Sequence, residues 1–268
     1  MRPVGAANET NNGTPKDDKD PMPPPYQQPH FDVFKDTLFV EQPAEGDSPT
    51  KWAARYGLQD DLDAALLPTI PLNRADVRAI CRDSDQPALV GYACAMAWGG
   101  QGSGQGGSKS VATAWADRAK LADQLTRLRV GGLSRSRAYD LFCGAGVVKG
   151  LGPSYFTKLL YFFSPALDFY IMDQWTAKSI NLLTGVHVVR VYDSSPTREN
   201  KGGNYQAFCE EVDHLAALLG QTGDQIEQRL FSDGGRRRAP WRAHVHAHYP
   251  YDRASLRDRY PHIPASDL

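Results

Sequence analysis

Apolar residues recur at helical spacing over most of the chain between Lys51 and residue 231. Asn73 is a good N-cap for the first clear segment, and the glycines at 99–100 end the second. The predicted helices span 74–81, 87–98, 110–128, a short segment from 133, 153–163, 174–184, 203–219 and 223–231. Only HVVRVY at 187–192 has the alternation of a strand. The pattern therefore predicts an all-α fold.

Both ends of the chain lack this helical pattern. Residues 1–49 hold 9 of the 19 prolines, among them Pro23-Pro24-Pro25. Such a segment buries too little apolar surface to offset its ordering entropy. We expect disorder up to about residue 30 and loose attachment beyond it, with aromatic residues of 30–40 able to pack on the body. The predicted organisation is a disordered leader at 1–49, one helical domain at 50–232, and a basic, histidine-containing tail at 233–268.

Composition narrows the class of protein. The chain has 268 residues, of which 41% are hydrophobic and 23% charged, enough for a sizeable core. No stretch approaches the about 20 apolar residues that a membrane span needs. The first residues, MRPVGAANETNNG, lack the apolar region of a secretory signal. We therefore expect a cytoplasmic protein without a membrane segment.

Cysteine and histidine positions bear on metal binding. The four cysteines stand far apart, at Cys81, Cys94, Cys143 and Cys209. No C-x-x-C pair exists, which disfavours a zinc knuckle, a thioredoxin-type motif or an iron–sulfur cluster. In an extended tail, His244, His246 and His248 would point to one side and could bind a metal, but no acidic or cysteine partner lies in register. We expect reduced thiols, a solvated tail, no metal and no cofactor.

The formal net charge of −1 conceals an asymmetry along the chain. Residues 1–65 contain 6 Lys and Arg against 12 Asp and Glu, a net of −6, so residues 66–268 carry 24 against 19, a net of +5. A mildly basic body behind an acidic leader permits nucleic-acid binding without requiring it. The strongest basic cluster, Arg236-Arg237-Arg238 with Trp241 and Arg242, is unspecific but fits a DNA-facing tail.

Gly150-Leu151-Gly152 stands between two predicted helices. Its glycines allow a tight reversal and expose backbone N–H groups at the start of the helix that follows. Such N–H groups can hold a phosphate, and Pro153 suits the first helical position because its missing N–H is no loss there. Taken alone, the segment is as compatible with a plain helix–helix turn.

With Asp173 about 20 residues downstream, the segment resembles the hairpin of the helix-hairpin-helix DNA glycosylases. Their hairpin reads roughly L-P-G-x-G, and a catalytic Asp follows at a helix start; here Val148-Lys149 replaces Leu-Pro. The resemblance covers roughly residues 51–232 and is strongest to the bacterial 8-oxoguanine-glycosylase-like branch, through GLGPSYFTKLLYFF and MDQW. It implies an all-α fold with two small helical subdomains flanking a DNA groove.

The resemblance also implies which residues carry the chemistry. Asp173 would stabilise the positive charge that develops on the sugar as the N-glycosidic bond breaks, although an ordinary N-cap is the alternative. Bifunctional members use a Lys two residues past the second hairpin glycine, which is Ser154 here. Lys158 lies one turn later on the same helical face, so it is our candidate nucleophile; a phosphate contact is equally compatible. Whether the protein is also an abasic-site lyase stays open.

Further residues are candidates for DNA contact. Besides Gly150, Gly152 and Ser154 of the hairpin region, three cations could meet phosphates, namely Lys149, Arg135 and Arg137. A solvated helix flank is the alternative for the two arginines. Trp98 and Tyr161 are candidates for the pocket that receives an extruded base, where an aromatic face stacks on it; a core position is the alternative for Trp98. We place Tyr161 with Ser154 and Lys158 on the groove side of their helix.

The leading hypothesis is thus a monomeric DNA N-glycosylase that flips out and excises a modified base from double-stranded DNA. The resemblance leaves two substrate classes open. One is an oxidised purine such as 8-oxoguanine. The other is a hypermodified phage base such as glucosylated hydroxymethylcytosine, since related bacterial proteins act in phage defence. The alternative from another class is a non-catalytic helix-hairpin-helix module that only grips DNA.

Overall fold

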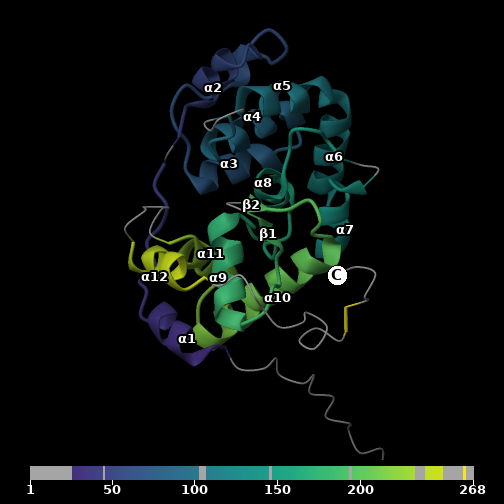
Figure 1. Cartoon of the computed structure of the whole chain (residues 1–268). Helices are drawn as coiled ribbons and strands as arrows, with labels where there is room; N and C mark the ends of the chain where they lie inside the picture. The colour runs from purple at the N-terminus through teal and green to yellow at the C-terminus, as the bar shows by residue number, and fades with distance from the viewer. Residues whose placement is uncertain are drawn as a thin grey trace, which may run out of the picture.

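The computed structural model describes residues 26–44, 46–102, 107–144, 147–192, 195–232, 239–249 and 262–263. Within these ranges the regular secondary structure is helical apart from two short strands, which confirms the predicted all-α class (Figure 1). The elements are α1 (Gln28–Lys35), α2 (Pro49–Arg55), η1 (Ala64–Leu66), α3 (Arg74–Arg82), α4 (Ala88–Trp98), α5 (Gly107–Ala116), α6 (Arg118–Val130), α7 (Arg135–Asp140), α8 (Pro153–Phe163), α9 (Gln174–Thr184), β1 (Val191–Tyr192), β2 (Ser195–Pro196), α10 (Gly202–Leu219), α11 (Gly223–Phe231) and α12 (Pro240–His248). No helix of the described ranges has the length and apolarity to cross a membrane.

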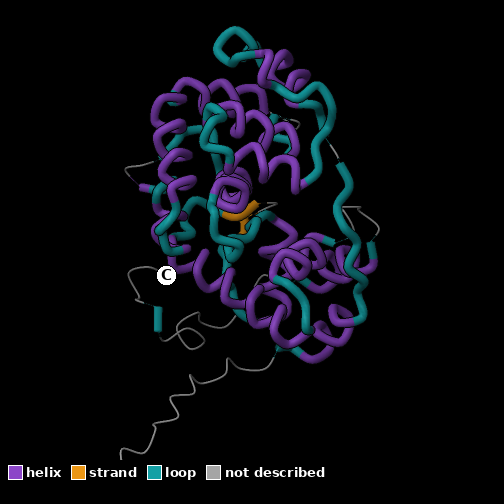
Figure 2. Tube along the Cα trace, turned by 180° about the vertical axis from the view of Figure 1, so that it is seen from behind, coloured by secondary structure: helices purple, strands orange, loops and turns teal. Residues whose placement is uncertain are grey.

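The helices gather into two groups (Figure 1). α2 to α6 pack on one another in the upper group, and α9 to α12 pack together with α1 in the lower group. α8 lies between them and contacts α3, α4 and α6 of the upper group as well as α7 and β2. Seen from behind, the short antiparallel pair of β1 and β2 lies near the middle of the molecule (Figure 2). The residues around α8 therefore lie where the two groups meet.

α8 is buried around most of its circumference, unlike the amphipathic helix that we expected. Every side chain from Phe156 to Phe163 is buried, including Lys158 and Tyr161, which the sequence placed on a groove side. The apolar run LLYFF provides contacts for helices on several sides at once. The prediction of one buried face and one groove face for this helix is therefore wrong, because α8 packs between two groups of helices.

Capping and turn residues in the sequence predict most helix boundaries to within a few positions. Asn73 caps α3 as predicted, in a capping box in which its side chain accepts from the Asp76 N–H and the Asp76 carboxylate accepts in return. The predicted helix at 110–128 is instead two helices, α5 and α6, separated at Asp117. The break accompanies tertiary bonds to Asp61, which accepts from Trp115 Nε1 at 2.6 Å and pairs with Arg118 at 3.7 Å.

The two ends of the described chain differ from the expected leader and tail. α1 and α12 pack against α9 and against each other. The fully buried ring of Phe34 lies 5.0 Å from that of Trp241, which is also fully buried, and Arg229 donates to the Phe34 carbonyl at 2.8 Å. Apolar burial over this long sequence separation orders segments that show no helical pattern alone. Residues 1–25 and Arg236-Arg237-Arg238 lie outside the described residues.

The three tail histidines are helical rather than extended. In α12, His244 and His248 share a face and their rings stack at 4.2 Å, while His246 is exposed. His30 of α1 completes the contact, with its Nδ1 3.0 Å from His244 Nε2. In a helix, residues two positions apart point to different sides. His246 therefore does not share a face with His244 and His248, as it would in an extended chain. The described residues contain no group of three His, Cys, Asp or Glu arranged to hold a metal.

Candidate functional site

The hairpin before α8 requires glycine at its first turn. Gly150 has φ +85°, and a Cβ there would lie 2.2 Å from the Ser110 carbonyl oxygen. Gly152 is the N-cap of α8, and its carbonyl accepts from Tyr155 N at 2.9 Å and Phe156 N at 3.0 Å. The Arg198 guanidinium donates to the Leu151 carbonyl between them. The hairpin is therefore held on both sides by tertiary contacts.

Backbone donors of this hairpin are left unused. The N–H groups of Gly150, Gly152 and Ser154 donate to no other described residue. They gather at the N-terminus of α8, where the helix dipole favours an anion. The side chain of Lys149 is exposed beside them. The arrangement has what a phosphate contact needs, namely free N–H donors and a nearby cation.

Lys158 is a buried lysine in the middle of α8. Its Nζ donates to the Ser154 carbonyl at 2.8 Å and lies 5.4 Å from the centre of the Tyr155 ring. Its stem packs against Gly99, where a Cβ would lie 2.6 Å from Lys158 Cδ. Burial lowers the pKa of Lys158, and the charges of Asp173 and Glu227 oppose that shift. A desolvated amine of this kind is the form of lysine that acts as a nucleophile.

Asp173 is the N-cap of α9, and the cap occupies only one of its oxygens. Oδ1 accepts from Trp175 N at 2.7 Å and from Thr176 N at 3.0 Å, while the Thr176 hydroxyl accepts from Asp173 N. All hydrogen bonds of this carboxylate within the described residues go to Oδ1. The capping alternative and a catalytic role are therefore compatible, because Oδ2 remains available.

A hydroxyl links the chain neighbours of the two candidate catalytic residues. Thr157, the neighbour of Lys158, accepts at Oγ1 from the backbone N–H of Met172, the neighbour of Asp173, at 3.1 Å. Thr157 also donates to the Pro153 carbonyl at 2.8 Å, so its side chain is fully engaged. This link fixes the start of α9 against α8. The charge of Asp173 opposes the lowering of the Lys158 pKa, and a shared catalytic role of the two residues stays a prediction.

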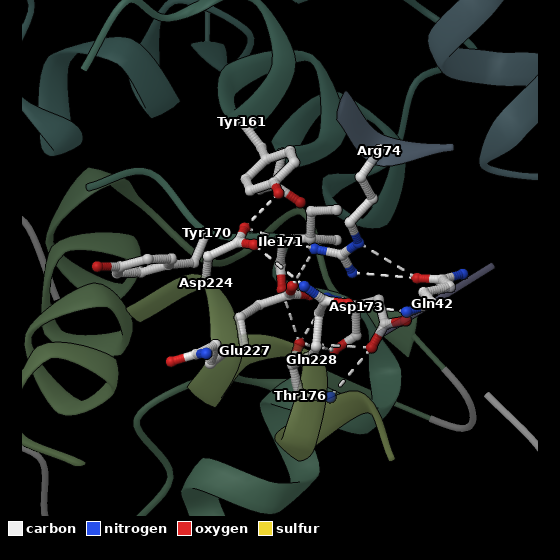
Figure 3. Close-up of polar contacts among 12 residues, drawn as sticks. Gln42, Arg74, Tyr161, Tyr170, Ile171, Asp173, Thr176, Asp224, Glu227 and Gln228 are labelled. Atoms are coloured by element: carbon white, nitrogen blue, oxygen red, sulfur yellow. Dashed lines mark hydrogen bonds and ion pairs between the residues drawn. The ribbon is translucent and has the colours of Figure 1, made fainter. Parts of the chain in front are cut away.

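A largely buried polar cluster that the sequence did not reveal lies beside Asp173 (Figure 3). Arg74 of α3 is its centre: its guanidinium pairs with Glu227 of α11, and Nε and Nη2 donate to Gln42 Oε1 at 3.3 and 3.2 Å. Asp224 pairs with Arg78 at 3.2 Å and accepts from the Tyr161 hydroxyl. We call Gln42, Arg74, Tyr161, Asp224 and Glu227 the Arg74 cluster.

Burial shifts the acid–base properties of this cluster. It raises the pKa of Glu227 to about 7, although the Arg74 charge opposes the shift. Burial works against the charge of Arg74, but Glu227 and Asp224 outweigh it and raise the Arg74 pKa. A carboxyl group whose pKa is raised by burial next to a specific charged partner is typical of functional sites.

Neither of the two aromatic residues predicted to line a base pocket lies on an open surface. Trp98 packs against the Arg74 cluster, and Tyr161 is part of it. Trp98 is 8% exposed, meets Phe162 edge-on at 5.1 Å, and has Arg74 at 5.2 Å from its ring. Arg74 and Arg78 lie 5.3 and 4.2 Å from the Tyr161 ring. Arginine thus covers a face of each ring, so stacking of a base on either ring stays a prediction.

The two upstream arginines differ in their contacts within the protein. Arg135 is nearly buried: its Nη1 pairs with Asp213 at 2.7 Å and its Nε donates to the Asp168 carbonyl at 2.9 Å. Its charge is compensated within the protein, and a phosphate contact of this residue stays a prediction. Arg137 is exposed on α7, and its role in DNA binding stays a prediction.

Comparison with known families identifies the chain. A family model described as "putative 8-oxoguanine DNA glycosylase OGG-like protein" matches residues 40–231. This chain belongs to that family. The match runs from the segment before α2 to the end of α11 and contains Lys158, Asp173 and the Arg74 cluster. No curated protein and no solved structure matches the chain.

The family match leaves α1 and α12 outside it. Both nevertheless support the matched domain at α9, the helix that Asp173 caps. Arg242 of α12 lies over the Trp175 ring at 4.5 Å and donates to the Phe231 carbonyl at 2.8 Å. The charge of Asp173 raises the pKa of Arg242, although burial lowers it more. The two terminal helices α1 and α12 are therefore part of the same packed domain and contact α9, which begins at Asp173.

Proposed function

We propose that this OGG-like glycosylase excises an oxidised purine from double-stranded DNA, with Lys158 as nucleophile and Asp173 as the carboxylate that assists it. The observation that carries the proposal is the buried amine of Lys158, desolvated within reach of the Asp173 charge and directly behind a hairpin with unused N–H donors. A structural lysine gains nothing from such burial, since desolvation disfavours its charge.

The proposed reaction divides the work among these residues. The hairpin N–H groups and Lys149 hold a DNA phosphate while the target nucleotide leaves the stack. The free amine of Lys158 attacks C1′ of the sugar: the Nζ–C1′ bond forms, the C1′–N bond to the base breaks, and the base leaves with a proton. Asp173 stabilises the positive charge on the sugar through Oδ2. The C1′–O4′ bond then breaks as the sugar ring opens, which leaves a protonated O4′ and an imine between Lys158 Nζ and C1′. This imine permits strand cleavage, so the proposal includes abasic-site lyase activity.

A duplex oligonucleotide with a single 8-oxoguanine tests the proposal. The wild-type protein is expected to release the base and to nick the strand, while Asp173→Asn and Lys158→Gln lose both activities. Lys51→Gln, which removes an exposed lysine on α2, serves as the matched control and keeps them. Duplex binding by the wild type without any product from this or a glucosylated-cytosine duplex supports the non-catalytic alternative. Release of the glucosylated base alone reassigns the substrate to a hypermodified phage base.

A further inference from the structure

Buried asparagines hold the short strand pair of β1 and β2 in place. Asn200 accepts from the Arg190 N–H at 2.8 Å and donates to the Arg190 carbonyl at 2.9 Å. Asn181 makes the same two contacts with Val189, at 3.0 and 2.7 Å, and Asn204 donates to the carbonyl of the residue before Val189 at 3.1 Å. Because a strand pair of this length is not stable alone, these three side chains fix the backbone that leads into β1.

Tyr192 of β1 carries an exposed aromatic ring on this fixed backbone. It is 72% exposed, and no other Phe, Tyr or Trp of the described residues is exposed to this extent. Its backbone pairs with Ser195 of β2, which is also exposed. The ring therefore adds little to the packing of the protein. A tyrosine ring with a fixed backbone loses little conformational entropy when it stacks on a partner.

The strand pair lies close to the hairpin that precedes α8. Arg198 follows β2, is exposed, and donates to the Leu151 carbonyl of that hairpin. The chain from Ser195, the partner of Tyr192, to Arg198 is three residues long and spans at most about 10 Å. This length corresponds to about three base steps of a duplex, at about 3.4 Å each. A duplex bound at the hairpin would therefore lie within reach of the strand pair.

The charged groups on the strand pair differ in their compensation. Arg190 pairs with Glu199 at 3.8 Å. Arg198 forms no ion pair within the described part of the chain, and its guanidinium lies at the carbonyl between the unused N–H donors of Gly150 and Gly152. A guanidinium in such a position favours an anion such as a DNA phosphate.

The strand pair also contacts the helices of the candidate catalytic residues. β2 contacts α8, which carries Lys158, and both strands contact α9, which begins at Asp173. Figure 2 shows the pair near the middle of the molecule, next to α8. The exposed ring of Tyr192 is thus attached to the same two helices as the proposed chemistry.

We propose that the strand pair of β1 and β2 is a second DNA-contacting surface of this protein. Arg198 contacts a phosphate next to the one that the hairpin holds, and the Tyr192 ring stacks in the gap that the extruded nucleotide leaves. Extrusion breaks the stacking on both sides of a base, and an aromatic ring in the gap restores part of it. The inference rests on the proposed function only in that a nucleotide leaves the stack.

Binding to a duplex with a built-in gap tests the role of Tyr192. Fluorescence anisotropy compares an intact duplex with the same duplex containing one tetrahydrofuran residue, which has no base and cannot form an imine. Tyr192→Ala is expected to bind the gapped duplex about 10-fold more weakly and the intact duplex within about 2-fold of wild type. Tyr192→Phe keeps the ring and the affinity. The control Leu218→Ala, at a side chain that is 60% exposed on α10, changes neither affinity. An unchanged affinity of Tyr192→Ala for the gapped duplex, or an equal loss on both duplexes, would overturn this role.

A salt series tests the role of Arg198. Arg198→Gln is expected to reduce the slope of log affinity against log salt by about 1 on both duplexes, while Arg198→Lys keeps the charge and the slope. Lys51→Gln, which removes an exposed cation on α2, leaves the slope in place. An unchanged slope in Arg198→Gln would overturn the phosphate contact.

These measurements separate the inference from the proposed function, because neither duplex contains a base to be excised. If wild type prefers the gapped duplex and Tyr192→Ala loses that preference, the inference stands even when no base is released from any DNA. If wild type releases an oxidised purine but Tyr192→Ala keeps the preference, only the inference fails.

Discussion

Lys158 Nζ donates a hydrogen bond to the carbonyl oxygen of Ser154, one turn earlier on α8, at 2.8 Å. Side chains of a helix lean toward its N-terminus, so Lys158 returns its amine toward the hairpin. The bifunctional helix-hairpin-helix glycosylases, which the sequence resembles, have a lysine at the position of Ser154. The bond between these two residues therefore explains how a lysine one turn later can supply an amine to the same region.

This geometry predicts that Lys158 alone forms the imine with abasic DNA. Lys158→Arg keeps a positive charge but cannot form an imine, so cyanoborohydride trapping is expected to vanish. Lys149→Gln removes the exposed hairpin lysine and keeps trapping at saturating protein. The measurement is a denaturing gel followed by mass spectrometry of the DNA-linked peptide. A linked peptide that contains Lys149 and not Lys158 contradicts the assignment.

Gly150 should be far less tolerant of substitution than a glycine of similar backbone conformation. Gly150→Ala places a Cβ 2.2 Å from the Ser110 oxygen, and we expect a loss of about 2 kcal/mol or more of unfolding free energy together with weaker DNA binding. Gly132→Ala is the matched control: its φ is +76°, but no atom lies within 4 Å of the new Cβ, so about 1 kcal/mol is expected. Urea unfolding of the two variants compares them. Equal losses would show that the contact with Ser110 is unimportant.

Two basic residues near the hairpin should respond differently to loss of charge. Lys149→Gln is expected to weaken duplex binding and to reduce the slope of log affinity against log salt by about 1, as loss of one phosphate contact does. Arg135→Gln breaks the pair with Asp213 and should lower stability by about 2 kcal/mol without changing that slope. Fluorescence anisotropy over a salt series measures both slopes. A reduced slope in Arg135→Gln would instead indicate that Arg135 contacts a DNA phosphate.

The contact between α1 and α12 should be a substantial part of the stability. Phe34→Ala removes a fully buried ring beside Trp241 and is expected to cost about 3–4 kcal/mol. Leu38→Ala, at a side chain that is 80% exposed shortly after α1, should change stability by at most about 0.5 kcal/mol. Thermal or urea unfolding of both variants measures the difference. Similar values for the two would mean that α1 is dispensable for the domain.

How much of the site the sequence reveals depends on how local its signals are. Gly150, Gly152 and Asp173 stand at helix ends, where capping and turn preferences are readable from a few neighbouring residues. Arg74 and Glu227 are 153 residues apart and have no local pattern that would pair them. The same holds for Phe34 of α1 and Trp241 of α12, whose rings pack together across the chain. The ion pair of Arg135 with Asp213 is another long-range contact that no local pattern indicates.

The most direct test of the account is mass spectrometry of the bases released from DNA by the wild type and by Asp173→Asn. Asparagine is as good an N-cap as aspartate, so the variant should keep α9 and its fold while losing the negative charge at Oδ2. The substrates are oxidised plasmid DNA, unmodified genomic DNA and DNA from a phage with glucosylated cytosines. The account predicts that the wild type releases an oxidised purine and that Asp173→Asn releases it on the order of 100-fold more slowly or worse. Binding to every DNA with no base released, or equal release by both proteins, would contradict it.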